Sequence, residues 1–155
     1  MTDRPAKDQS AADGPHMDPE AIDAFLARPL IARLATSDNN RPRVLPMWFV
    51  WDGADVWMET SPTFANVRVL RRNPNAALSV DESSGPFGLR AVLMRGQVEL
   101  VETPAERVLD TVQRIYQRYM LPEELASEAG RAMLAAGHLL LRFTPERIVT
   151  WDTTA

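Results

Sequence analysis

The segment Arg43–Pro74 limits the possible folds of this chain more than any other part of it. It holds a long apolar run, an Asp52-Gly53 turn, a second apolar run, and then an amphipathic segment that stops at Asn73-Pro74. This order predicts a strand, a hairpin turn, a second strand and a helix. The helix is expected to begin with Ser61 as its N-cap and Pro62 in its first position. A strand that runs directly into a helix leaves backbone N–H groups pointing outward, so the sequence predicts a site for an anionic group at this step.

The first strand of this unit is expected to run from Arg41 to Trp51. Its continuous apolar run, LPMWFVW, indicates a strand that is buried on both faces. Pro46 lies inside that run, and because proline has no backbone N–H it predicts a bulge or a sheet edge. A backbone that leaves its ladder offers free N–H and C=O groups to a ligand, whereas a plain sheet edge needs no ligand. The sequence leaves both interpretations open.

The rest of the chain predicts one domain over residues 18–155, preceded by a disordered tail over residues 1–17. The expected strands cover residues 30–36, 41–51, 54–60, 75–81, 89–101, 138–144 and 147–152, with a bulge or bend at Gly96 and a turn at Pro145. The expected helices cover residues 18–28, 61–72, 103–120 and 122–136. The second of them is expected to bury Phe64, Val67 and Leu70. The third is expected to open with a capping box over residues 103–106. Six or seven strands in hairpins, with a few inserted helices, predict an antiparallel α+β barrel.

The residue types that the chain lacks exclude several kinds of chemistry. It has no cysteine, which excludes disulfides, a thiolate nucleophile and a cysteine-based metal site. The two histidines, His16 and His138, are too few for a His-rich metal centre, and Ser83 and Ser84 show no motif that would join His138 in a hydrolase triad. The single lysine, Lys7, lies in the expected tail, which excludes a Schiff-base mechanism in the folded domain. Redox chemistry would therefore need a bound cofactor.

Charge and hydropathy restrict the partners. The net charge of -4 and the pI of about 5.2 argue against nucleic acid. No apolar run approaches the roughly 20 residues of a membrane span, and residues 1–17 lack the apolar core of a signal peptide. We therefore expect a cytoplasmic protein with no membrane partner and no nucleic-acid partner.

Four segments, taken in order, carry a resemblance to a known family. They are the hairpin RPRVLPMWFVWDG, the strand-to-helix step ending in LRRNPNAALSVD, the strand RGQVEL and the closing FTPERIVTWD. Over Asp18 to Asp152 the chain resembles the pyridoxamine 5'-phosphate oxidase-like split β-barrel proteins, and most of all their flavin/deazaflavin oxidoreductase branch. The resemblance implies a split barrel that forms a homodimer with two cofactor sites at the dimer interface. Members of the family bind FMN or the deazaflavin coenzyme F420, and some bind other ligands.

The resemblance also implies nine cofactor-binding residues in two groups. Those against the cofactor ring or in the wall of its pocket are Val44, Leu45, Pro46, Met47 and Trp48. Those on the phosphate side are Arg43, Thr60, Ser61 and Asn66. Each has a structural explanation as well, because apolar strand residues often belong to the core, arginines often pair with acids and hydroxyls often cap helices. No catalytic protein residue is predicted, since hydride transfer from such a cofactor requires no protein acid or base.

The chain departs from the family pattern at the phosphate. Family members usually carry a Ser or Thr, then Arg or Ala, then Lys at this step, where this chain has Phe64, Ala65 and Asn66. A charge-assisted contact contributes roughly 1.5–3 kcal/mol, so losing one or two weakens binding by about 10-fold to several thousand-fold. Arg43, Thr60 and Ser61 offset part of this loss.

Two functions from different classes follow. The first is an FMN- or F420-dependent oxidoreductase that moves a hydride to or from a small organic substrate. The second is a degenerate member of the family that binds or sequesters a small apolar ligand instead of flavin. Phe64 in place of a polar phosphate ligand favours the second, and four tryptophans, Trp48, Trp51, Trp57 and Trp151, suit an aromatic pocket as well as a core.

Overall fold

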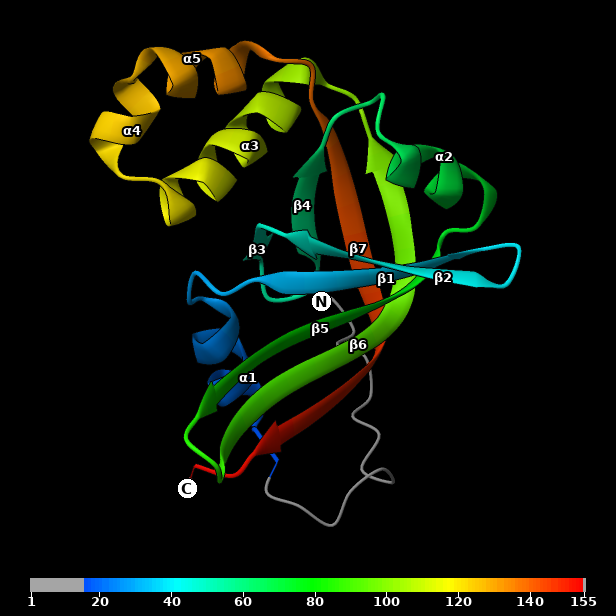
Figure 1. Cartoon of the computed structure of the whole chain (residues 1–155), viewed down its shortest axis with the longest axis vertical. Coiled ribbons are helices and arrows are strands. Elements are labelled where there is room, and N and C mark those ends of the chain that lie inside the picture. Colours follow the sequence, from blue (N-terminus) through cyan, green and yellow to red (C-terminus); the bar gives the residue numbers. More distant parts are fainter. Residues whose placement is uncertain (1–15, 155) are drawn as a thin grey trace.

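The computed structural model describes residues 16–154, which form a seven-stranded antiparallel sheet with five helices (Figure 1). The strands are β1 (Ala32–Asp38), β2 (Arg41–Met47), β3 (Phe49–Trp51), β4 (Val56–Thr60), β5 (Asn75–Ser84), β6 (Gly88–Val101) and β7 (Leu139–Asp152). The helices are α1 (Pro19–Leu26), α2 (Ala65–Arg72), α3 (Ala105–Tyr119), α4 (Pro122–Ala126) and α5 (Glu128–Ala135). The strands are hydrogen-bonded in the order β2-β1-β5-β6-β7-β4-β3.

The two edges of this sheet are joined by one residue. β2 ends at Met47 and lies at one edge, whereas β3 begins at Phe49 and lies at the other. Consecutive Cα atoms are only about 3.8 Å apart, so Trp48 can connect the two edges only if the sheet curls until they meet. No ladder joins β2 to β3, and the result is a split barrel that is not closed by hydrogen bonds. The predicted α+β split-barrel fold is confirmed.

Apolar side chains from the strands and from α1 fill the interior of the barrel. Phe49, Met58, Leu78 and Phe143 are almost completely buried there. Helix α1 adds three buried side chains to the same cluster, and the Asp18 side chain caps this helix by accepting from the Ala21 N–H at 2.8 Å. A second apolar cluster lies outside the barrel, where α3 packs on β3, β4 and β7.

The expected strand over residues 41–51 is wrong in two respects. It breaks at Trp48, and its first half is mostly exposed instead of buried on both faces. The reason is that β2 pairs only with β1 among the described strands, so its apolar residues line the rim of the barrel. The inference from Pro46 is correct, because the proline lies on an edge strand. The Asp52-Gly53 turn is also correct, and Gly53 has the positive φ of 94° that favours glycine there.

The last two expected strands are in fact one strand, β7. Of the two alternatives predicted at Gly96, a bulge or a bend, the bulge is present, as a register shift between Arg95 and Gly96 opposite Pro145. A Cβ on Gly96 would lie 2.0 Å from the Thr144 backbone oxygen, so glycine allows β6 to approach β7 closely. The bulge accommodates Pro145 inside a long strand, where the sequence had suggested a turn.

The helices after residue 103 begin and divide differently from expectation. The N-cap of α3 is Pro104 with no side-chain cap bond, so the predicted capping box is wrong. The helix expected over residues 122–136 is split into α4 and α5 by Ser127, whose hydroxyl accepts from the Gly130 N–H at 3.1 Å. Together α3, α4 and α5 form a helical layer at one end of the molecule (Figure 1).

The predicted tail falls largely on residues 1–15, which lie outside the described residues. Within the described range, Met17 is buried and its N–H donates to Thr150 Oγ1 at 3.0 Å. No helix within residues 16–154 has both the length and the apolar character needed to cross a membrane.

Candidate functional site

A pocket of about 410 Å³ opens between the end of β2, the end of β4 and the start of α2. It lies where the chain leaves the sheet edge and where the strand-to-helix step begins. Seven of the nine predicted site residues line it: Leu45, Pro46, Met47, Trp48, Thr60, Ser61 and Asn66. The other residues that line it are Glu59, Phe64 and Ile115.

Trp48 forms the wall of the pocket on the helical side. Its ring stacks on Tyr119, with centroids 5.0 Å apart and planes at 1°, and meets the edge of Tyr116 at 6.0 Å. The Tyr119 hydroxyl donates to the Leu30 carbonyl at 2.7 Å and accepts from the Phe49 N–H at 3.3 Å. Burial raises the pKa of Tyr119, so this phenol stays protonated at neutral pH. The hydrogen bonds fix Tyr119, and Tyr119 in turn fixes the indole of Trp48.

The strand-to-helix step supplies the polar end of the pocket. Thr60 and Asn66 are both buried, and Thr60 Oγ1 donates to Asn66 Oδ1 at 3.3 Å. Helix α2 begins at Ala65, and its N-cap is Phe64, which provides no side-chain cap. No side chain therefore caps the backbone N–H groups in the first turn of α2. An anion site at a helix N-terminus requires such uncapped N–H groups.

Two expectations about this helix are wrong. Ser61 is not its N-cap, because residues 61–64 form a turn, closed by the Phe64 N–H donating to the Ser61 carbonyl at 3.1 Å, before the helix begins. Phe64 is not buried either, since 61% of the residue is exposed. Val67 and Leu70 are buried as predicted. The late helix start leaves the Phe64 ring at the mouth of the pocket instead of in the core.

Arg43 and Val44 do not line this pocket. Arg43 is exposed on β2, where its charge is a minor contribution to lowering the pKa of Asp38 beside the dominant hydrogen bond from Arg72. Val44 is 61% exposed and lines a different groove of about 510 Å³ on a sheet face. Besides Val44, that groove is lined by side chains of β1, β5, β6 and β7: Arg33, Ala35, Ala77, Leu78, Ser79, Leu93, Met94, Arg95, Arg147, Val149 and Trp151.

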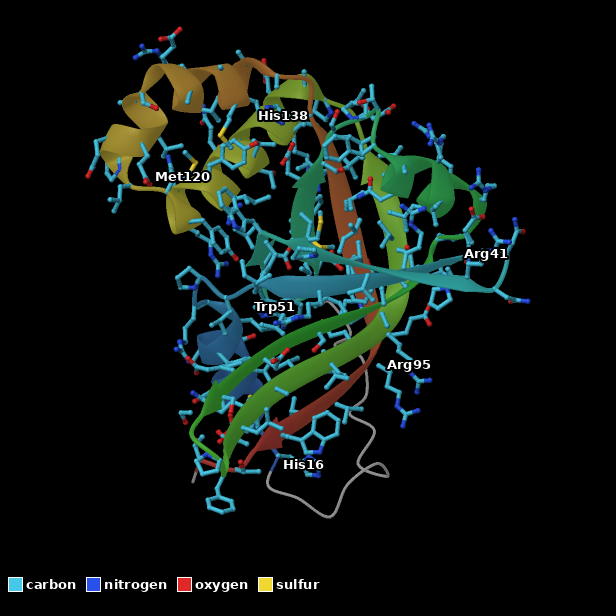
Figure 2. The ribbon with its side chains drawn as sticks, in the orientation of Figure 1. His16, Arg41, Trp51, Arg95, Met120 and His138 are labelled. Carbon is cyan, nitrogen blue, oxygen red and sulfur yellow. The ribbon has the colours of Figure 1, made fainter. Side chains whose placement is uncertain are left out.

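Glu59 is the functional candidate that the sequence did not reveal. It is the one ionisable residue lining the pocket among those that the structure describes. Its Oε1 lies 2.9 Å from His138 Nδ1, and His138 Nε2 lies 3.1 Å from the Leu134 carbonyl. Figure 2 shows His138 where the helical layer meets the start of β7. Residues 59 and 138 are 79 positions apart, so no local pattern could have joined them.

The residue types of the site limit its chemistry. No group of three or more His, Cys, Asp or Glu side chains suited to a metal ion occurs within residues 16–154. The described residues that line the pocket offer aromatic and aliphatic walls, two hydroxyls, one amide and one carboxylate, and none of them carries a positive charge. It can bind a planar aromatic group with a few directed hydrogen bonds.

Comparison with known proteins gives the family. A model of the pyridoxamine 5'-phosphate oxidase family matches residues 18–152. The chain belongs to this family. The comparison with curated proteins gives no match.

Solved structures agree with the family assignment. A conserved hypothetical protein from Mycobacterium tuberculosis is 24% identical, with a TM-score of 0.79 over 92% of this chain and 89% of that one. A solved F420 reductase is 26% identical, with a TM-score of 0.62 over 82% of this chain and 94% of its own. An FAD- and heme-binding protein from Mycobacterium smegmatis is 19% identical, with a TM-score of 0.70 over 89% and 72% of the two chains. The family fold therefore occurs in proteins that bind flavin-type cofactors.

Proposed function

We propose that the chain binds a flavin-type cofactor, FMN or the deazaflavin coenzyme F420, in the pocket between β2, β4 and α2, and acts as an oxidoreductase on a small organic substrate. One observation carries this proposal: the fold brings seven of the nine residues implied by the resemblance into one pocket. Family membership and the similarity to an F420 reductase support it.

The residues present fit the ring of such a cofactor better than its phosphate. Leu45, Pro46 and Met47 offer an apolar strand edge for a planar ring, and Trp48 closes the pocket behind it. Thr60, Ser61 and the first turn of α2 offer neutral donors for a phosphate. No arginine or lysine lines the pocket within the described chain. We therefore expect the phosphate to contribute less to affinity than the charge-assisted contacts typical of the family would.

When bound, the cofactor supplies the hydride chemistry, and the protein's residues bind and orient it. The fixed stack of Trp48 on Tyr119 holds the pocket wall in one orientation. The buried pair of Thr60 and Asn66 holds the polar end. The apolar residues of β2 exclude water from the ring face that they cover.

We further propose that the protein is a homodimer in which the second copy covers the groove beside Val44. Val44 and Leu93 are exposed apolar side chains in that groove. β2 contributes Val44 to the groove and Leu45 to Met47 to the pocket, so a copy seated on the groove would lie close to the cofactor site. This arrangement suits a site that is completed at a dimer interface.

The experiment that tests the function is an absorbance spectrum of the freshly purified and dialysed protein, followed by titration with FMN, riboflavin and F420. Bands of a retained flavin or deazaflavin, or saturable binding at micromolar concentration, would support the oxidoreductase. Because riboflavin is FMN without its phosphate, the ratio of the two affinities measures what the phosphate contributes. A colourless protein that binds none of the three would refute the proposal.

A second function has its own supporting observation. Phe64 is exposed at the pocket mouth, and the pocket has no cation within the described residues. Both features suit a protein that binds or sequesters a small apolar or aromatic ligand without flavin. The same titration separates the two functions, since only the first predicts saturable flavin or deazaflavin binding.

A further inference from the structure

A single carboxylate, that of Glu59, lies among aromatic and aliphatic walls in the candidate pocket. Trp48, Phe64 and Ile115 line the pocket around it. The Glu59 side chain is 21% exposed, whereas His138 behind it is only 7% exposed. The accessible part of this acid therefore faces the pocket, and its partner faces the protein.

The contacts of His138 show how the carboxylate is held. His138 Nδ1 lies 2.9 Å from Glu59 Oε1, and His138 Nε2 lies 3.1 Å from the Leu134 carbonyl. The imidazole ring is therefore held at both of its nitrogens, and the nitrogen that faces Glu59 orients the carboxylate.

Tyr116, on α3, lies beside this pair of residues. Burial first, and then the nearby charge of Glu59, raise the pKa of Tyr116 to about 12. The phenol is therefore neutral at pH 7 and adds no charge beside the acid. The Tyr116 and His138 rings meet edge to face, with centroids 6.2 Å apart, and this contact helps to fix the imidazole that faces Glu59.

This arrangement leaves part of the carboxylate unused. A carboxylate has about four acceptor positions, and His138 occupies one of them. The remaining positions are available on the side that lines the pocket. An oriented acceptor beside apolar walls favours a ligand that combines a planar ring with a hydrogen-bond donor.

We propose that Glu59, held by His138, receives an N–H donor of a planar nitrogen-containing ligand, so that the pocket prefers amidine-like or protonated heteroaromatic groups to anionic ones of the same shape. This inference rests on the proposed role of the pocket as the ligand site. It does not depend on which cofactor the protein uses. Among the described residues, Glu59 is the one ionisable side chain that lines the pocket, and its charge disfavours anions.

The test uses three probes of nearly equal shape and different charge: benzamidinium, benzamide and benzoate. We expect affinities in that order for the full-length protein without added flavin, with at least about a 10-fold difference between benzamidinium and benzoate. Binding is measured by ligand-observed NMR, and the site by shifts of the backbone amides of Trp48 and Thr60. Equal affinities, a preference for benzoate, or no saturable benzamidinium binding at millimolar concentration would each overturn the inference.

Two matched variants identify the responsible acid. Glu59→Gln keeps the shape and removes the charge, and should remove the preference for benzamidinium. Glu123→Gln is the control, because Glu123 lines a neighbouring pocket of about 550 Å³ that shares Trp48 with the candidate pocket. A loss of preference in Glu123→Gln, with none in Glu59→Gln, would place the cation in the other pocket and overturn the inference. If Glu59→Gln does not fold, the three probes on the unmodified protein decide the matter.

Failure of this inference differs from failure of the proposed function. Binding of FMN or F420 without any preference among the three probes would refute the role of Glu59 and leave the cofactor proposal standing. A Glu59-dependent preference for benzamidinium in a protein that binds neither cofactor would refute the cofactor proposal and leave the role of Glu59 standing.

Discussion

Asn66→Lys restores a cation at the place where the family usually has one. Asn66 lines the pocket beside Thr60, and it lies at the start of α2, where the helix dipole also favours an anion. A charge-assisted contact to a phosphate contributes about 1.5–3 kcal/mol. The substitution also removes the 3.3 Å bond from Thr60 and places an ammonium at a position that is 3% exposed, which costs about 1 kcal/mol or more. The expected net effect is FMN binding about 10-fold tighter.

Riboflavin provides the decisive comparison for this substitution. It lacks the phosphate, so its affinity should stay within about twofold while that of FMN rises. The control is Asn75→Lys, which adds the same charge at an exposed position outside the pocket. Fluorescence titration gives both affinities, and thermal unfolding shows whether the variants are folded. Equal tightening of riboflavin and FMN, or no change for either in a folded variant, would show that residue 66 does not face the phosphate.

Three further substitutions test the interface, the bulge and the first turn of the hairpin. Val44→Glu places a charge on the exposed groove and should convert a dimer into a monomer in light scattering; an unchanged dimer would place the interface elsewhere. Gly96→Ala should lower the free energy of unfolding by about 1–3 kcal/mol in a urea titration, because the added Cβ would lie 2.0 Å from a backbone oxygen of β7. Gly137→Ala is the control: its Cβ would meet nothing within 4 Å, so the free energy of unfolding should not change. Asp52→Ala removes an acceptor that binds two turn N–H groups at 2.7 and 2.9 Å and the Trp57 indole at 2.8 Å, so it should cost about 2 kcal/mol at pH 7. Burial tends to raise the pKa of Asp52, but these hydrogen bonds outweigh burial and lower the pKa. The difference in unfolding free energy between the unmodified protein and Asp52→Ala should therefore be present above about pH 4 and shrink as the pH falls through the lowered pKa. Equal differences in unfolding free energy at pH 6 and pH 3 would contradict this.

Sequence reasoning succeeded where a local rule decides the structure. Asp52-Gly53 predicted a hairpin, Pro46 predicted a bulge or a sheet edge, and Gly96 predicted a bulge or a bend. The structure has the hairpin, the sheet edge at Pro46 and the bulge at Gly96. Each prediction rests on a backbone property of one or two residues, namely a positive φ, a missing N–H or a missing Cβ. Such properties survive in almost any tertiary context.

Sequence reasoning failed where contacts between distant parts of the chain determine the local structure. The apolar run through Trp48 looks like one strand, because its two halves are both apolar, although they lie at opposite edges of the sheet. Ser61 and Pro62 have the pattern of a helix start, yet the helix begins only at Ala65. The pair formed by Glu59 and His138 depends on β4 lying beside β7, which no local pattern contains.

The position of β7 has a consequence for how the chain folds as it is synthesised. This strand is the last of the seven to leave the ribosome, yet it lies between β6 and β4 and supplies Leu139, Leu141 and Phe143 to the core. Until it emerges, β4 has only the three-residue β3 as a partner and one of its edges is open. The hairpins β1–β2 and β5–β6 can form early from neighbouring residues, but the pocket wall that contains Glu59 cannot form until β7 pairs with β4. A nascent chain therefore acquires its ligand site only after β7 has emerged and has paired with both β6 and β4.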